Sequence, residues 1–67
     1  MEAGWIKVFT ADEEYQAEVI KNLLENNGFL PVLLDKKDDE FRLGVAEVYV
    51  APNEAEKAKA IITENQA

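Results

Sequence analysis

The order in which hydrophobic periodicities follow one another along the chain constrains its fold most. Residues 5–10 alternate as a strand does and are rich in β-branched and aromatic side chains. Helical spacing follows over about 11–27, and two short apolar runs at 31–35 and 45–50 then have the character of strands. Helical spacing returns over about 52–64. The sequence therefore predicts a β-α-β-β-α unit.

Residues that start and stop secondary structure stand at the boundaries of these segments. Thr10 and Glu13 fit a capping box, which predicts a helix N-terminus there. Gly28 suits the left-handed position that closes a helix. Pro31 stands at the first position of a strand, where a missing N–H is tolerated, and Pro52 fits the first turn of the second helix.

Elements in this order can assemble in few ways. A strand, a helix and a second strand join by a right-handed crossover, and a connection over 35–44 lets the third strand return antiparallel beside the second. We therefore expect a single α+β domain over 1–67, with a three-stranded sheet of order 1-3-2 and two helices on one face. This is a ferredoxin-like sheet without its fourth strand. The strand residues expected to face the helices are Ile6, Val8, Val32, Leu34, Val48 and Val50.

The opposite face of this sheet has no predicted element to cover it. An apolar patch on a small soluble protein usually marks an interface, and the first strand is also left as an unpaired sheet edge. We interpret this face as an interface with a protein partner or a second copy, or as a surface for a small molecule or peptide. Partial burial by the chain termini and nucleic-acid binding are the remaining alternatives. The residues expected on this face are Trp5, Lys7, Phe9, Leu33, Glu47 and Tyr49.

The composition excludes several classes of function. The chain contains no His, Cys or Ser, so it lacks the usual nucleophile pairs, disulfides and zinc ligands. We therefore expect no catalytic residue, metal site or cofactor, and do not expect an enzyme. Fourteen acidic against seven basic residues give a formal charge of −7, which repels phosphate backbones and anionic membranes. No signal peptide or spanning segment is evident, so we expect a cytoplasmic protein that binds neither nucleic acid nor membrane.

The charged stretch between the second and third strands is a second candidate site. It has no helical periodicity and is too long for a tight hairpin, which indicates an exposed loop. Its acidic cluster lacks the ligand spacing and central Gly of an EF-hand, so a solvated loop is favoured over a weak cation site. The residues expected to contact an effector there are Lys36, Lys37, Asp38, Asp39 and Arg42.

The chain resembles a family of short bacterial domains along most of its length. The residues that carry the resemblance are W-I-K-V-F-T, A-E-V-I-K-N-L-L-E-N-N-G-F, P-V-L-L and V-Y-V-A-P-N-E-A-E-K-A. This pattern, from about Trp5 to Ile62, is similar to the putative prokaryotic signal-transducing protein family, whose fold is likened to the nitrogen-regulatory PII proteins. The resemblance implies a PII-like, ferredoxin-like fold and a role in signalling. PII proteins bind effectors around a long loop that corresponds to residues 35–44 here.

Two functions follow from these features. The first is a regulatory module that binds a small-molecule effector or a protein partner through the loop, the uncovered sheet face or both. The alternative is a structural module that forms a homodimer through the same face or through the edge of the first strand. The long loop together with the family resemblance motivates the first, although likeness of fold does not by itself carry function.

Overall fold

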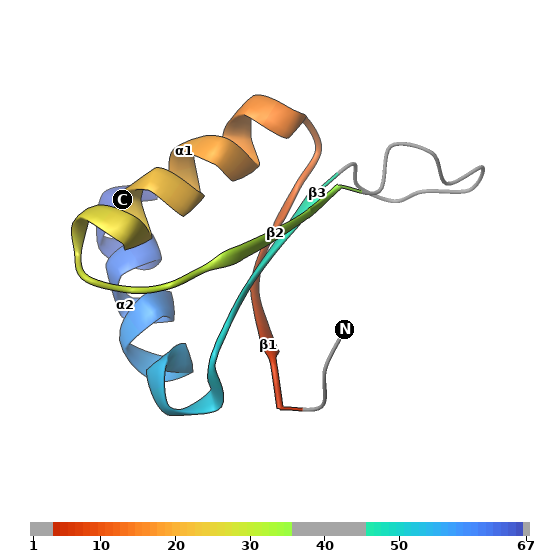
Figure 1. Cartoon of the computed structure of the whole chain (residues 1–67). Helices are drawn as coiled ribbons and strands as arrows, with labels where there is room; N and C mark the ends of the chain where they lie inside the picture. The colour runs from red at the N-terminus through yellow and green to blue at the C-terminus, as the bar shows by residue number, and fades with distance from the viewer. Residues whose placement is uncertain (1–3, 36–45, 67) are drawn as a thin grey trace.

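The computed structural model describes residues 4–35 and 46–66 and has the predicted order of elements (Figure 1). The elements are β1 (Ile6–Ala11), α1 (Glu14–Asn26), β2 (Val32–Asp35), β3 (Ala46–Val50), a 3₁₀ turn η1 (Pro52–Glu54) and α2 (Ala55–Gln66). Strand β3 lies in the middle of a three-stranded antiparallel sheet of order β1-β3-β2. The α+β, ferredoxin-like arrangement expected from the sequence is confirmed.

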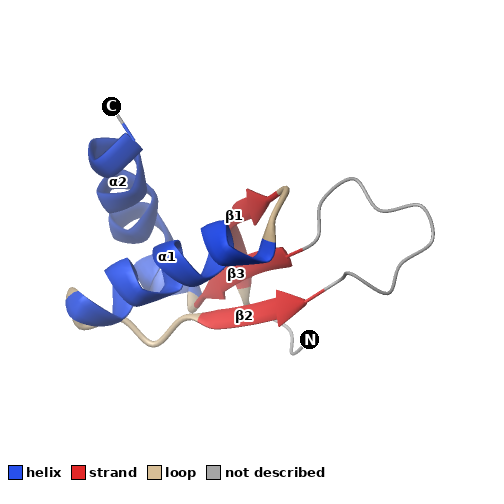
Figure 2. Cartoon of the chain, turned by 90° about the horizontal axis from the view of Figure 1, so that it is seen from above, coloured by secondary structure: helices blue, strands red, loops and turns tan. Residues whose placement is uncertain are grey.

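Both helices lie on the same side of the sheet (Figures 1 and 2). Helix α1 packs on all three strands, and α2 packs mainly on β1. The fully or almost fully buried apolar side chains between the two layers are Ala11, Ala17, Ile20, Leu24, Phe29, Ala46, Val48, Val50, Ala58 and Ile62. Each large one contributes about 1.5–3 kcal/mol to the free energy of folding.

Strand β1 contains a β-bulge that the alternation of its sequence did not predict. Lys7 pairs with Tyr49, but the next pair is Phe9 with Val48, so Val8 is an extra residue in β1. Directly opposed residues of neighbouring strands share a face of the sheet. Phe9 therefore lies on the helix side with Val48, where it packs against the core. Its expected position on the opposite face was wrong, because one inserted residue reverses the alternation.

The face assignment of β2 was also wrong. Leu33 pairs with Val48 and packs against the core, so it lies on the helix side. Leu34 pairs with Glu47, which places Leu34 and Val32 on the side away from the helices. The three apolar residues of this short strand give no alternation from which to choose a face. Pairing with β3 decides the register instead.

Helix α1 begins later than its sequence suggested. Thr10 is still part of β1, where it pairs with Glu47, so the capping box expected from Thr10 was wrong. The N-cap residue is Glu13, and its backbone N–H donates to the side-chain oxygen Oε1 of Gln16 at 3.4 Å. The helix therefore starts at Glu14.

The C-terminal end of α1 confirms the role expected for Gly28. This residue has φ +88°, a backbone conformation that residues with a Cβ rarely adopt. The backbone N–H of Gly28 donates to the carbonyl of Glu25 at 3.1 Å, and that of Phe29 donates to the carbonyl of Leu24 at 3.0 Å. These two bonds form a Schellman motif, and the buried side chains of Phe29 and Leu24 supply the apolar contact that accompanies it.

Replacing Gly28 tests this helix end. We expect Gly28→Ala to lower the free energy of unfolding by about 1–2 kcal/mol, the cost of a left-handed residue with a Cβ. A Cβ at this position meets no atom within 4 Å, so the loss comes from the backbone alone. Gly28→Asn is the matched control and should lose less, because Asn tolerates this conformation. Urea unfolding measures both variants, and an alanine variant as stable as the wild type would contradict the assignment.

Candidate functional site

The side of the sheet away from α1 and α2 is the candidate site, and we call it the open face. Within the described residues, neither helix lies on it (Figure 2). Trp5, which directly precedes β1 and is half-buried, follows the same alternation as Lys7. The strand residues on the open face are Lys7, Thr10, Val32, Leu34, Glu47 and Tyr49.

A carboxylate held by two partners occupies the centre of the open face. Glu47 lies on the middle strand and is only 8% exposed. The ammonium Nζ of Lys7 lies 3.3 Å from its Oε2, and the hydroxyl of Tyr49 donates to its Oε1 at 2.7 Å. Both oxygens therefore have a partner, as a buried charge requires. The register of β1 and β3 places Lys7 directly opposite Tyr49, so the two partners reach Glu47 from neighbouring positions.

The hydrogen bond to Glu47 raises the pKa of Tyr49 above its usual value of 10.0. Partial burial of the phenol and the negative charge of Glu47 raise it further. Tyr49 is therefore a neutral hydrogen-bond donor over the physiological pH range. The Lys7 side chain is about half exposed, so its ion pair with Glu47 contributes only about 0–1 kcal/mol to stability. The same exposure leaves its ammonium accessible to a second anionic group.

Apolar side chains from β2 border this polar cluster. Val32 pairs with Tyr49 and Leu34 with Glu47, and both are half-buried although no described helix covers them. A few fixed polar groups among apolar side chains are typical of surfaces that bind a specific partner.

The structure brings together three of the six residues expected on this surface. Lys7, Glu47 and Tyr49 form the central cluster, and Trp5 directly precedes β1, two residues before Lys7. Phe9 and Leu33 lie on the helix side. Thr10, Val32 and Leu34 of the open face were missed, and the bulge and the uniform apolar run of β2 left no signal to find them.

The loop expected to contact an effector lies outside the described residues. Its residues are Lys36, Lys37, Asp38, Asp39 and Arg42. Their role remains a prediction.

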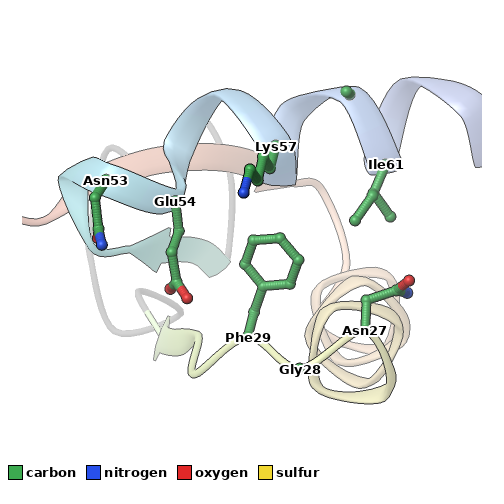
Figure 3. Close-up of a pocket in the computed structure, with 8 residues that line it drawn as sticks. Asn27, Gly28, Phe29, Asn53, Glu54, Lys57 and Ile61 are labelled. Atoms are coloured by element: carbon green, nitrogen blue, oxygen red, sulfur yellow. The ribbon is translucent and has the colours of Figure 1, made fainter.

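A hollow that the sequence did not indicate lies between the end of α1 and the start of α2 (Figure 3). It has a volume of about 600 Å³. The ring of Phe29 projects toward α2 at its centre, with Glu54 and Lys57 near one side of the ring and Asn27 and Ile61 near the other (Figure 3). The amide Nδ2 of Asn27 already donates to the carbonyl of Leu23 at 2.8 Å. The hollow is open and mixes both signs of charge, so it selects no class of ligand.

Comparison with protein families finds one that matches most of the chain. A family model described as "putative prokaryotic signal transducing protein" matches residues 5–66. The chain belongs to this family. The match includes every helix and strand described above, and it confirms the resemblance seen in the sequence. The description of the signal-transducing family names a signalling role and no catalytic activity. No curated protein and no solved structure matches the chain significantly.

The next two findings, on membrane spans and metal sites, cover only the described residues 4–35 and 46–66. Neither α1 nor α2 is long and apolar enough to cross a membrane. No group of three or more acidic, His or Cys side chains in this part of the chain is placed to hold a metal ion.

The pKa of Tyr49 tests the geometry of the central cluster. We expect Glu47→Gln to lower this pKa toward 10.0, because it removes both the hydrogen bond to the carboxylate and the negative charge. Titration of tyrosinate absorbance in a Tyr15→Phe background reports Tyr49 alone. Glu25→Gln is the matched control, since Glu25 pairs with Lys21 on α1 and should leave the pKa of Tyr49 unchanged. Equal pKa values in the parent and in Glu47→Gln would contradict the cluster.

The same shift predicts how stability depends on pH. The hydrogen bond from protonated Tyr49 to Glu47 raises the folded-state pKa of Tyr49 and stabilises the fold. This stabilisation is fully present below the unfolded-state pKa of Tyr49 and is lost as pH rises through its folded-state pKa. We therefore expect the difference in unfolding free energy between the wild type and Tyr49→Phe to shrink as pH rises above 10.0. Urea unfolding over this pH range measures the difference, and a constant difference would count against the shift.

Proposed function

We propose that this protein is a non-catalytic regulatory module of a prokaryotic signalling pathway, and that its open face recognises a protein partner or a small effector. The observation that carries the proposal is the position of Glu47. Glu47 is largely buried, with 11% of its side chain exposed, on a face that no described helix covers, and Lys7 and Tyr49 hold its carboxylate in place. The description of the family supports a role in signalling.

The fixed position of Glu47 favours recognition over simple solvation. Burying a carboxylate costs free energy that an exposed glutamate on a solvent-facing strand avoids, and the hydrogen bonds from its partners offset that cost. The result is a rigid polar centre beside Val32 and Leu34, two half-buried apolar side chains. Rigid groups lose little conformational entropy when a partner binds.

The chemistry of the open face also indicates what it would bind. Glu47 is already neutralised by Lys7, whose ammonium remains about half exposed. A partner that covers the face would therefore present apolar groups to Val32 and Leu34 and a hydrogen-bond acceptor or anionic group to Lys7. No catalytic step is proposed, since neither oxygen of Glu47 is left without a partner to act on a substrate.

Homodimerisation through the open face is the alternative. The observation that favours it is that Tyr49 lies on this face and half-buried Trp5 directly precedes β1, since aromatic side chains are enriched in protein interfaces. Pairing through the outer edge of β1 is less favoured, because the bulge and the exposed Lys7 are both features that blunt edge strands. Sedimentation equilibrium of the wild type and Trp5→Lys tests this alternative.

The proposal is tested by mapping where a ligand binds. ¹⁵N-labelled protein is mixed with fractions of a bacterial cell extract, separated into proteins and small molecules, and amide resonances are followed by NMR. We expect shifts to concentrate on open-face residues, including Lys7, Val32 and Tyr49. Leu34→Lys should abolish these shifts while the rest of the spectrum shows a folded chain. Leu30→Lys is the matched control, because Leu30 is 80% exposed and lies outside the open face.

Two results would contradict the open face as the recognition surface. One is a set of shifts confined to the helices. The other is a Leu34→Lys variant that responds as the wild type does.

A further inference from the structure

An apolar groove lies in the helical layer, on the other side of the sheet from the open face. It has a volume of about 400 Å³ and runs between α1, β1 and the C-terminal part of α2. The bulge in β1 turns Phe9 into this groove, and Ile20 and Leu23 of α1 line it beside Phe9. The complete lining is Phe9, Tyr15, Gln16, Val19, Ile20, Leu23 and Asn65.

Two of the three exposed large hydrophobic side chains in the described part of the chain lie at this groove. Within the described residues, the exposed large hydrophobic side chains are Tyr15 at 62%, Val19 at 59% and Leu30 at 80%. Tyr15 and Val19 both line the groove and stand one helical turn apart on α1. Single exposed hydrophobic residues are common, whereas two of them beside a half-buried phenylalanine form a continuous apolar surface.

Acidic residues outnumber basic ones next to the lining residues in the sequence, and the one lysine among them, Lys21 beside Ile20, pairs with Glu25. No charged side chain lines it, but exposed Asp12 and Glu13 precede the first turn of α1, and exposed Glu18 lies between Tyr15 and Val19. Glu64 is exposed next to Asn65 on α2. None of the lysines in the described part of the chain lines the groove. A ligand for it therefore needs apolar groups at the centre and positive charge at the margins.

We propose that this groove docks an amphipathic helix of a partner protein, with apolar side chains against Phe9, Tyr15 and Val19 and basic side chains toward the acidic margin. A helix that binds in an apolar groove presents one apolar face, and Tyr15 and Val19 offer it a row of apolar side chains along α1. A second copy of this chain fits less well, because its formal charge is also −7. The groove and the open face are different surfaces, so this inference does not rest on the proposed function.

A model peptide tests the proposal. The probe is a dye-labelled peptide of leucine and lysine, patterned so that the leucines form one face of a helix, and its binding is followed by fluorescence anisotropy. We expect the wild type to bind it, and Tyr15→Ser and Val19→Ser each to weaken binding about tenfold through lost apolar contact. Glu18→Gln should weaken binding and reduce its dependence on salt.

The structure offers a matched control for the hydrophobic variants. Leu30→Ser removes a large side chain that is more exposed than Tyr15 or Val19 but lies outside the groove, and it should leave peptide affinity unchanged. Because the three side chains are exposed, their truncation should leave the urea midpoint near that of the wild type. That measurement separates a binding defect from unfolding.

Several outcomes would overturn the proposal. They are an absence of binding by the folded wild type, equal binding of a shuffled peptide of the same composition, and equal binding of a leucine–glutamate peptide of the same pattern. Wild-type affinity in both Tyr15→Ser and Val19→Ser would also overturn it. Self-association of the protein that Val19→Ser abolishes would identify a second copy as the occupant and would overturn the proposal in favour of a dimer.

Discussion

The β-bulge at Val8 decides which side chains each surface of the molecule receives. Before the bulge, Lys7 lies on the open face opposite Tyr49, and after it Phe9 lies on the helix side opposite Val48. Without the inserted residue, strict alternation would place Lys7 and Phe9 on the same face. The bulge thus gives the open face its cation and gives the helical layer an aromatic side chain.

The middle strand β3 serves both sides of the sheet at once. Ala46, Val48 and Val50 are fully buried against the helices, while Glu47 and Tyr49 between them form the polar cluster of the open face. A rigid core behind the strand holds the backbone on which this cluster depends. The open face and the core are therefore energetically linked through one strand, and core stability helps fix the geometry of the candidate site.

The sequence was sufficient where the signal is local and repeated. The element order followed from long periodic segments, and the closing position of Gly28 followed from a backbone conformation that glycine alone adopts easily. The bulge could not be predicted, because it depends on pairing between β1 and β3, which are far apart in sequence. The same is true of β2, where Val32, Leu33 and Leu34 are all apolar and only pairing with β3 selects the face. Lys7, Glu47 and Tyr49 were found because the part of β1 before the bulge and the whole of β3 do alternate.

The side of the sheet on which Phe9 lies tests this account most directly. A nuclear Overhauser spectrum of the protein reports which protons are close to the Phe9 ring. If the bulge turns Phe9 to the helix side, this ring should give cross-peaks to the methyl groups of Ile20 and Leu23, which line the same groove on α1. Cross-peaks from the Phe9 ring to Tyr49 instead, with none to α1, would place Phe9 on the open face and contradict the bulge.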